Sequence, residues 1–446
     1  MITRLWRNNM KNIISKILLI IFAISTPGVM FAQEKLSLKQ AVEIGLQNNY
    51  SIQIANNNQD ITSKNREAAI SNLLPKVDAT ASLNKSTVDT RQVFVTGVVQ
   101  ERSSAKSSQQ NAGLQLSWVL FDGMKMFASY ERVKELESMG EVNAKAMVQG
   151  VLADIVINYF AIVASQEQLK VSEDALAVSK KRVEIAESKN QIGAGSTLDL
   201  LNAKVDYNTD LSSLIRQQES LKNLKIRLNE LLILPVGNDI VLTDSIPTDK
   251  IINAEELYNK VLSQNPNLLL AKSQQRIAEL NVREVSADRY PTLRLNSGYN
   301  YSNQNAEAGF FTENRTQGLN YGISASVNIF NGLLQSKKEK IAKLQSQSAV
   351  FSYEQAKLSV DANWNALLNS YQNNLQLLKL EKENQIVAKK NIDISIEKFK
   401  LGGISSLQLR EAQRAYIESN ARYINALYQY KLAEISLLEL SSSILP

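Results

Sequence analysis

The sequence of 446 residues contains no cysteine and no histidine. The absence of cysteine excludes disulfide bridges, a cysteine nucleophile and lipid attachment through an N-terminal cysteine. The absence of histidine excludes a Ser–His–Asp triad, and the absence of both residue types removes the usual zinc ligands. No group of residues supports an enzyme, and we expect neither a cofactor nor a metal site.

Long apolar runs are scarce, and the one near the start of the chain has the features of a signal peptide. Four basic residues precede it: Arg4, Arg7, Lys11 and Lys16. The apolar run Ile17–Ile24 is too short to span a bilayer, and cleavage is expected after Ala32. We assign residues 1–32 to a signal peptide. The alternative is an uncleaved anchor, because Met30 is an imperfect residue for the cleavage site.

A strong charge of either sign is also missing. The chain has 50 Lys and Arg against 44 Asp and Glu, and four of the basic residues belong to the signal peptide. The remainder is close to neutral, which argues against nucleic acid as a partner. This remainder has no run of about 18 apolar residues, so a transmembrane helix is not expected. If the chain spans a membrane, it must do so with strands.

Proline and glycine are rare, with 7 and 17 residues, and their positions divide the chain into two similar halves. Pro75 and Pro291 each close a helical stretch. Further along, the same separation relates three pairs of markers: Phe121-Asp122-Gly123 with Phe330-Asn331-Gly332, Gly193 with Gly402, and Tyr207 with Tyr416. A fixed internal period predicts one structural unit used twice. We predict repeats over residues 33–234 and 254–446, joined by a linker over 235–253.

Each repeat is predicted to contain a helix, two strands, a long helix, a tight turn and a last helix. The first repeat has a leading helix from Leu36 to Leu74, strands within about 77–121, and helices over 124–193 and 197–234. The second has strands within about 292–330, and helices over 333–401 and 405–445. Each long helix covers roughly 70 residues and would be on the order of 100 Å long.

The strands alternate between apolar and small polar residues. In the second repeat Leu319, Tyr321 and Ile323 interleave with Asn320, Ser324 and Ser326. In the first, a Ser/Gln-rich loop over 103–111 is expected between the strands. A half-buried soluble sheet shows the same period. The small polar residues favour a membrane barrel with a water-filled lumen. We therefore expect Asn320, Ser324 and Ser326 to face the lumen, and these residues to face lipid: Leu114, Trp118, Leu319, Tyr321, Ile323 and Val327.

The long helices carry apolar residues near the coiled-coil spacing, such as Leu152, Val156 and Tyr159 in the first repeat. Elsewhere the apolar stripe is spread out. A helix with neighbours on both sides, as in a ring of helices, would show two stripes. The alternative is an ordinary two-stranded coiled coil.

These features together resemble the TolC family of outer-membrane efflux proteins, over essentially all of the chain after the signal peptide. The resemblance rests on the duplicated layout, on Leu74-Pro75-Lys76-Val77 and Tyr290-Pro291-Thr292-Leu293, and on the Phe-Asp-Gly and Phe-Asn-Gly turns. It also rests on the helix–turn segments that begin at Gly193 and Gly402. Each motif is short, but their order and spacing are the same in both halves.

The resemblance implies a mixed α and β membrane protein. Three chains would share a twelve-stranded outer-membrane β-barrel, with four strands per chain, which continues into a long periplasmic α-helical coiled-coil barrel. Four strands cannot close a barrel alone, because about eight is the smallest number that packs. The implied function is a passive export duct in a tripartite efflux or type I secretion system. Its implied partners are two further copies of the chain, outer-membrane lipid, a periplasmic adaptor and an inner-membrane transporter.

The resemblance also implies functional residues at the turns that end the long helices. Gly193, Gly195, Gly402 and Gly403 would contact the adaptor. Acidic residues just after the turns would line a closed gate, and the matching positions are Asp199, Gln408 and Glu411. Gln408 departs from the acidic pattern, and Asp199 also suits a helix N-terminus capped by Ser196.

Four basic residues near the same turns are candidates for ion pairs with carboxylates or for a solvated face: Lys398, Lys400, Arg410 and Arg414. A periplasmic coiled-coil adaptor or structural protein without a membrane barrel is the alternative function. It accounts for the helices but leaves the four alternating strands unexplained.

Overall fold

The computed structural model describes residues 35–248, 252–309 and 311–444, so the predicted signal peptide lies outside the described residues. The chain divides into two compact units. Unit 1 contains the residues up to Asn48 together with Asp154–Thr248 and Lys379–Tyr428. Unit 2 contains Asn49–Ala153, Asp249–Leu378 and the residues from Gln429 onwards. The two units are described separately below.

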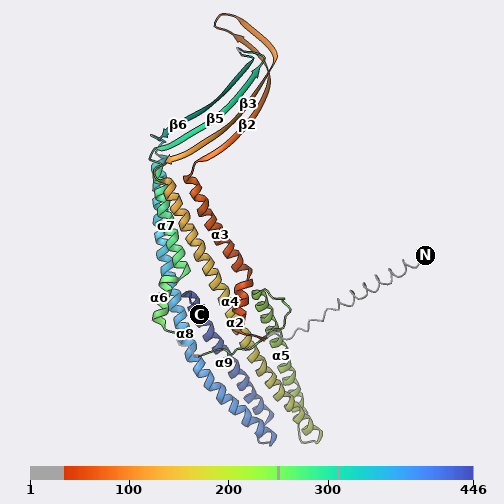
Figure 1. Ribbon diagram of the computed structural model, residues 1–446. Helices are drawn as coiled ribbons and strands as arrows, with labels where there is room; N and C mark the ends of the chain where they lie inside the picture. Colours follow the sequence, from red (N-terminus) through yellow and green to blue (C-terminus); the bar gives the residue numbers. More distant parts are fainter. Residues whose placement is uncertain (1–34, 249–251, 310, 445–446) are drawn as a thin grey trace, which may run out of the picture. The chain divides into compact units, whose positions relative to one another are not determined.

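Two helices of equal length run through both units. Helix α4 covers Lys125–Gln191 and α8 covers Leu334–Lys400, each with 67 residues (Figure 1). Each follows a pair of residues with positive φ, Gly123–Met124 and Gly332–Leu333. Helices α5 (Thr197–Leu232) and α9 (Ser406–Leu440) follow after short turns. These bounds lie within a few residues of the predicted ones, except that α9 ends earlier than 445.

The leading helices are not single helices as predicted. The stretch from Leu36 to Leu74 contains α2 (Leu38–Asn48), α3 (Tyr50–Ile70) and a 3-10 turn, η1 (Ser71–Leu73). In the second half α6 (Ala254–Gln264) is followed by α7 (Pro266–Ala287). An asparagine in extended backbone, Asn49 or Asn265, starts each new helix and accepts hydrogen bonds from its first N–H groups.

The predicted linker contains a strand that pairs with the start of the described chain. In unit 1, β4 (Val241–Leu242) lies parallel to β1 (Lys35–Leu36). The Tyr159 hydroxyl donates to Leu36 O at 2.9 Å and to Asp244 Oδ2 at 2.8 Å, and Leu38 N donates to the same carboxylate at 2.7 Å. Burial and the Asp244 carboxylate raise the pKa of Tyr159 to about 12. The part of the predicted linker up to Thr248 therefore belongs structurally to unit 1.

Helix α4 contains an 18-residue window with mean hydropathy 1.8, which by length and composition alone is enough to cross a membrane. No helix that could cross a membrane was expected from the sequence, and this window is an exception by composition. Half of the window is buried within the protein. The buried side chains include Ile155, Tyr159 and Ile162, which have no exposed surface. Packing therefore accounts for the apolar character of this window.

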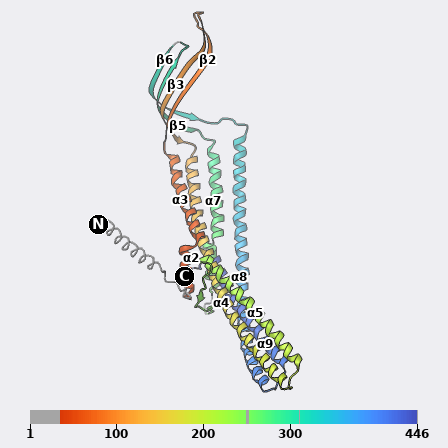
Figure 2. The same cartoon turned by 90° about the vertical axis from the view of Figure 1, so that its right-hand side faces the viewer.

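Unit 2 contains a four-stranded antiparallel sheet (Figure 2). Its strands are β2 (Lys76–Val93), β3 (Val99–Phe121), β5 (Thr292–Ala306) and β6 (Glu313–Ser326), in the order β2-β3-β5-β6. The predicted loop over 103–111 was wrong, because these residues belong to β3: residues 105–111 pair with β2, and 107–111 also pair with β5. Their Ser and Gln side chains alternate in facing direction, as in any strand. The last strand ends at Ser326, before the predicted end, so Val327 follows it.

Candidate functional site: a two-faced sheet and the helical tip

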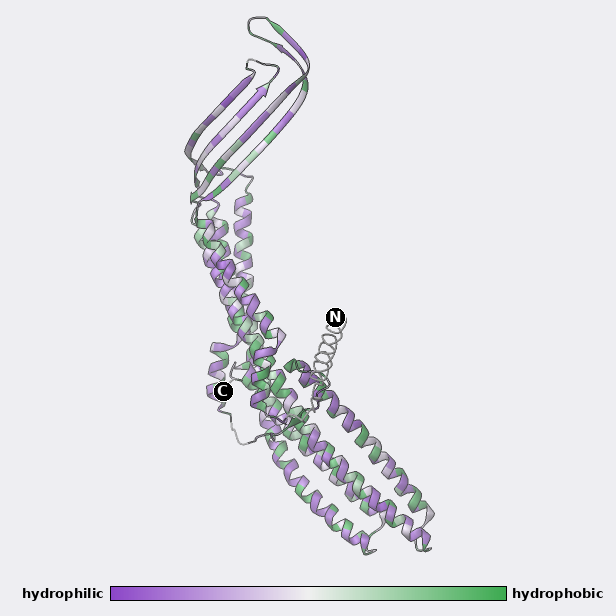
Figure 3. Ribbon diagram, turned by 45° about the vertical axis from the view of Figure 1, so that its right-hand side comes forward, coloured by the Kyte–Doolittle hydropathy of each residue, from purple (hydrophilic) through white to green (hydrophobic). Residues whose placement is uncertain are grey.

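The register of the sheet separates apolar from polar side chains. Directly paired residues share a face, and the pairs Leu114–Tyr299 and Tyr299–Leu319 place three apolar side chains in one row. The same face carries apolar residues on all four strands, including Val77, Ala79, Leu83, Leu116, Trp118, Leu293, Leu295, Tyr321 and Ile323. Figure 3 shows the alternation along the strands as changes of hydropathy. We call this side the apolar face.

The opposite side, called the polar face, is made mostly of small polar residues and glycine, and it also carries the charged residues Lys76, Asp78 and Arg294 near the starts of β2 and β5. Asn320 and Ser324 lie on it, and Ser326 follows two positions later. Neighbouring strands are joined there by side-chain hydrogen bonds. Asn296 Nδ2 donates to Ser324 Oγ at 3.2 Å, and Ser302 Oγ donates to Asn111 Oδ1 at 2.8 Å. The three residues predicted to face a lumen therefore share one face, opposite Leu319, Tyr321 and Ile323.

The helical tip consists of the two turns that join α4 to α5 and α8 to α9, with the helix ends beside them. Gly193 and Gly402 have φ of +72° and +77°, a conformation that glycine adopts without strain. Ala194 N donates to Lys189 O and Gly403 N donates to Lys398 O, both at 2.8 Å. These bonds close the last turn of each long helix in the same way. Gly193, Gly402 and Gly403 are exposed, and Gly195 is half-buried.

Two of the predicted gate residues, Asp199 and Gln408, occupy the first turns of α5 and α9, and the third, Glu411, lies in the second turn of α9. Asp199 is exposed in the first turn of α5, where Ser196 caps the helix by accepting from Leu198 N at 3.1 Å. Gln408 has a structural role, because its Oε1 accepts from Ser405 N at 2.9 Å while Gln408 N donates to Ser405 Oγ at 3.2 Å. This is a capping box. Glu411 is exposed one turn into the helix.

The four basic residues proposed for ion pairs behave differently from one another. Lys400 pairs with Glu397 at 2.7 Å and Arg414 with Glu418 at 3.7 Å, each within one helix and exposed. Lys398 is exposed as well. Arg410 is largely buried and contacts carboxylates of another helix. The solvated-face interpretation therefore holds for three of the four residues.

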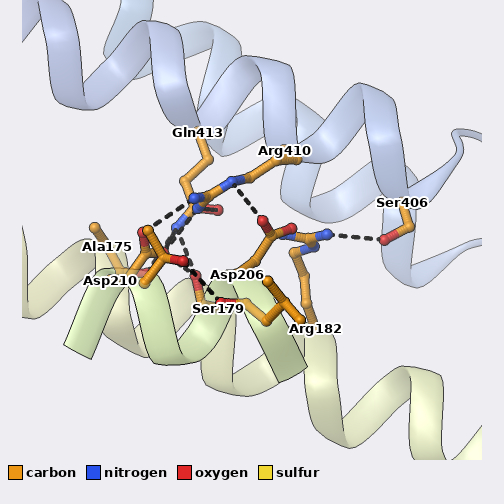
Figure 4. Close-up of polar contacts among 10 residues, drawn as sticks. Ala175, Ser179, Arg182, Asp206, Asp210, Ser406, Arg410 and Gln413 are labelled. Carbon is orange, nitrogen blue, oxygen red and sulfur yellow. Dashed lines mark hydrogen bonds and ion pairs between the residues drawn. The ribbon is translucent and has the colours of Figure 1, made fainter. Parts of the chain in front are cut away.

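Arg410, one of the candidates for an ion pair, belongs to a buried polar network whose other members were not predicted, the tip network (Figure 4). Its guanidinium donates two hydrogen bonds to Asp210, at 2.8 and 3.1 Å, and lies 3.5 Å from Asp206. Arg182 donates to Asp206 at 3.0 Å and to Ser406 Oγ at 3.1 Å. The network thus joins α4, α5 and α9 of unit 1. The only signal in the sequence was the spacing of Asp206 and Asp210, which places both on one helix face.

Gln413 completes the tip network. Its Nε2 donates to Ala175 O at 2.8 Å, to Ser179 Oγ at 2.9 Å and to Asp210 Oδ2 at 3.1 Å, and Ser179 Oγ donates to the same carboxylate. Gln413 and Ser179 are fully buried, and Asp210 is 8% exposed. A buried carboxylate is tolerated only when it is paired and hydrogen-bonded, so Arg410 and Gln413 are what allow Asp210 to stay in place.

An apolar cluster lies beside the tip network in unit 1. Ile392 and Phe399 of α8 pack with Leu409 and Ala412 of α9. Lys189 of α4 lies 5.3 Å from the centre of the Phe399 ring, on its face. The tip of each chain is therefore held by a polar network on one side and by apolar packing on the other. Within the described residues, no group of three or more acidic side chains is placed to hold a metal ion.

The sequence matches the family described as "Outer membrane efflux protein" over residues 42–232 and 257–442. The chain is a member of the outer membrane efflux protein family. The outer membrane protein TolC of Vibrio cholerae is 23% identical over 372 residues, which cover 82% of this chain and 81% of TolC. The cation efflux system protein CusC of Escherichia coli K12 is 22% identical over 352 residues, which cover 75% of this chain and 73% of CusC.

Solved structures of outer-membrane channels share the fold of this family member. The CmeC outer membrane channel of Campylobacter jejuni superposes with a TM-score of 0.79 at 17% identity, covering 91% of this chain and 85% of CmeC. The outer membrane protein VceC of Vibrio cholerae gives 0.76 at 16% identity, covering 91% and 96%. The resemblance to the TolC family is confirmed. This chain is therefore an outer membrane efflux protein, and its fold matches those of solved outer-membrane channels.

Proposed function

We propose that three copies of the chain form one closed twelve-stranded barrel and act as the passive outer duct of a tripartite efflux system. The observation that carries this proposal is the two-faced sheet. In the described part of the chain, the edge strands β2 and β6 each pair on one side only. Open sheet edges do not occur within lipid, so an apolar face of this kind requires neighbours that close the sheet.

The apolar stripe on α8 supports the same assembly. In unit 2, Leu344, Phe351 and Leu358 recur every seven residues, and their side chains are exposed. In unit 1, Leu380, Val387 and Ile394 also recur every seven residues and are exposed, and they form a second stripe because 22 residues separate Leu358 from Leu380. An exposed heptad stripe is the seam of a coiled coil whose partner is absent from the single chain. We assign this seam to the adjacent copy in the trimer.

The helical tip is the proposed site of partner contact and of gating. Gly193, Gly195, Gly402 and Gly403 would meet a periplasmic adaptor, which links the duct to an inner-membrane transporter. Glu411 and Asp199 would line the narrow end of the duct. Their exposure in the single chain is consistent with this role, whereas Gln408 is committed to its capping box. The two halves of the chain would be tandem copies of one unit.

The alternative is a periplasmic adaptor or structural protein without a membrane barrel. It does not explain why the exposed side chains of the apolar face are leucine, isoleucine, valine and tyrosine. A soluble sheet of four strands would need a layer covering that face. Side chains such as Tyr321 and Ile323 are 81% and 70% exposed in the single chain. Lipid is the environment that suits them.

The assembly is tested by breaking the α8 seam. Phe351→Asp places a charge in the seam, and Ser352→Asp places the same charge on the next, exposed position of the helix. We expect Phe351→Asp to remove the trimer band from a native gel of detergent-solubilised membranes, and Ser352→Asp to keep it. Loss of the trimer in neither variant would contradict the assigned seam. Recovery of the wild-type protein outside the outer-membrane fraction would contradict the duct itself.

A further inference from the structure

The end of the β2–β3 hairpin carries an apolar segment that nothing in the single chain covers. It comprises residues 93–99, and we call it the hairpin end. The turn is closed by hydrogen bonds from Phe94 N to Val98 O and from Gly97 N to Phe94 O, both at 2.9 Å. Four valines around this turn are exposed: Val93, Val95, Val98 and Val99.

The hairpin end is separate from the apolar face of the sheet. Between Leu83 and Val93, β2 carries Lys85, Thr87, Asp89 and Arg91 on the side of the apolar face. Arg91 forms an ion pair with Glu101 at 2.6 Å. At about 3.3 Å per residue, this polar stretch puts the hairpin end roughly 30 Å along the strand from Leu83. Lipid contact of the apolar face therefore does not explain the four valines.

A bulge bends the hairpin between these two regions. The register of β2 and β3 shifts between Val88 and Thr90, Ser104 has a φ of +52°, and its N–H donates to Asp89 Oδ1 at 2.6 Å. A bulge of this kind bends the strand and increases its twist. Figure 1 shows the hairpin turning back beyond the ends of β5 and β6.

The direction of the bend follows from Arg102. Thr90 lies on the side of the polar face, so its partner Arg102 does too. The Arg102 guanidinium donates to Glu307 O, while Glu307 N donates to Lys106 O at 3.0 Å. In a straight strand Arg102 would lie about 13 Å beyond Lys106, farther than its side chain extends. This contact supports a bend toward the polar face, and the burial of Ala105, which lies on that face, agrees with it.

We infer that the hairpin ends of three copies bend over the outer mouth of the duct and pack against one another there. The inference rests on the proposed trimer, in which the polar face lines the lumen. A hairpin that bends toward that face reaches over the opening instead of outward into lipid. Three symmetry-related valine clusters would then cover each other and narrow the mouth with apolar side chains, a type of constriction that resists the passage of ions.

The absence of cysteine from the chain makes a direct test available. In the full-length protein, Val95→Cys introduces one thiol into each of the three copies. Mild oxidation should join two of these thiols in a disulfide, so a covalent dimer is expected. Leu83→Cys, an exposed position on the apolar face, is the matched control and should stay monomeric on a denaturing gel. Native mass spectrometry of the unoxidised sample reports the assembly separately. A trimer in which Val95→Cys neither forms the dimer nor is protected in the labelling experiment below overturns the inference and leaves the proposed function standing, whereas a monomer overturns both.

A second measurement does not depend on whether the Val95→Cys thiols are oriented to form a disulfide. A charged, membrane-impermeant maleimide added to intact cells should label Val95→Cys at least ten-fold more slowly than Thr87→Cys, which is exposed before the bend. Packed hairpin ends would protect the first thiol and leave the second accessible. Equal labelling rates in a trimeric protein would show that the ends are free in solvent or occupied by something the reagent displaces, and either result contradicts the inference.

Discussion

At the level of single residues, the helical tip contains carboxylates of two kinds. Asp210 is buried and receives hydrogen bonds from Arg410, Ser179 and Gln413. Asp199 is exposed, and the described structure assigns it no ion pair. Buried charges are kept only where their partners offset the lost hydration, whereas exposed charges are free to act on whatever passes. The first kind holds the tip together and the second is available for gating.

The structural carboxylate gives the first prediction. Arg410→Ala leaves Asp210 buried without its cation, which should destabilise the tip by about 2–4 kcal/mol, below the range for a fully buried pair because Arg410 is 15% exposed. Hydrogen exchange of α9 amides, followed by mass spectrometry, measures the change. The control is Arg414→Ala, whose exposed pair with Glu418 should contribute less than about 1 kcal/mol. Equal protection in the two variants would contradict a structural role for Arg410.

The exposed carboxylates give the second prediction. In a trimer, Glu411→Ala removes three charges from the narrow end of the duct, so cation selectivity in planar-bilayer recordings should fall. Asp199→Ala should act in the same direction. The control is Glu418→Ala, which removes an exposed charge of the same helix farther from the turn. If both tip variants keep the selectivity of the wild type, these carboxylates are ordinary charges near helix ends.

At the level of elements, the strands and the long helices follow from different kinds of sequence signal. Period-two alternation fixes which side chains share a face, and the register joins four such faces into one. The helices are bounded by glycines whose positive φ stops each helix. Both signals are local, which is why they could be predicted without the structure.

The two faces of β6 give the third prediction. Ile323→Arg puts a charge on the apolar face and should cost about 2–4 kcal/mol near the bilayer midplane, while Ser324→Arg on the polar face should cost much less. Urea unfolding of the protein in lipid vesicles measures the difference. Equal tolerance of arginine at the two adjacent positions would mean that the apolar face does not contact lipid.

Two glycines of different kinds give the fourth prediction. Gly402 has a φ of +77°, so Gly402→Ala forces a side chain into a left-handed conformation and should cost about 1–2 kcal/mol. Gly150 lies inside α4 with no atom within 4 Å of an added Cβ, so Gly150→Ala should stabilise the helix by about 0.5–1 kcal/mol. Thermal unfolding in detergent, monitored by circular dichroism, reports both. Opposite shifts of the midpoint are expected, and a stabilising Gly402→Ala would be incompatible with the turn described.

Other features could not be predicted because they depend on contacts between distant segments. The residues 103–111 look like a loop by composition, but they belong to β3, in which 105–111 pair with β2 and 107–111 also pair with β5. The helix breaks at Asn49 and Asn265 were within reach of the sequence, since asparagine is a strong helix cap. For the tip network, the sequence offered Arg410 as a candidate for an ion pair but not its partners, because Arg182, Asp206 and Asp210 lie far from it along the chain.

At the level of the whole molecule, the described chain leaves two surfaces that a single copy does not satisfy. One is the pair of open edges on β2 and β6, and the other is the exposed apolar stripe on α8. Both are satisfied together if identical chains are arranged in a ring, since every copy then pairs one sheet edge with each neighbour and packs its α8 stripe against an adjacent copy. Three copies of four strands give a barrel wide enough for an aqueous lumen.

Native mass spectrometry of the intact protein, released from outer membranes in mild detergent, tests this assembly most directly. The expected result is one dominant species with the mass of three chains without their signal peptides. This species should dissociate into single chains only on collisional activation or when the α8 seam is broken by Phe351→Asp. A single-chain species that persists across detergents and protein concentrations would contradict the shared barrel, and with it the duct that depends on it.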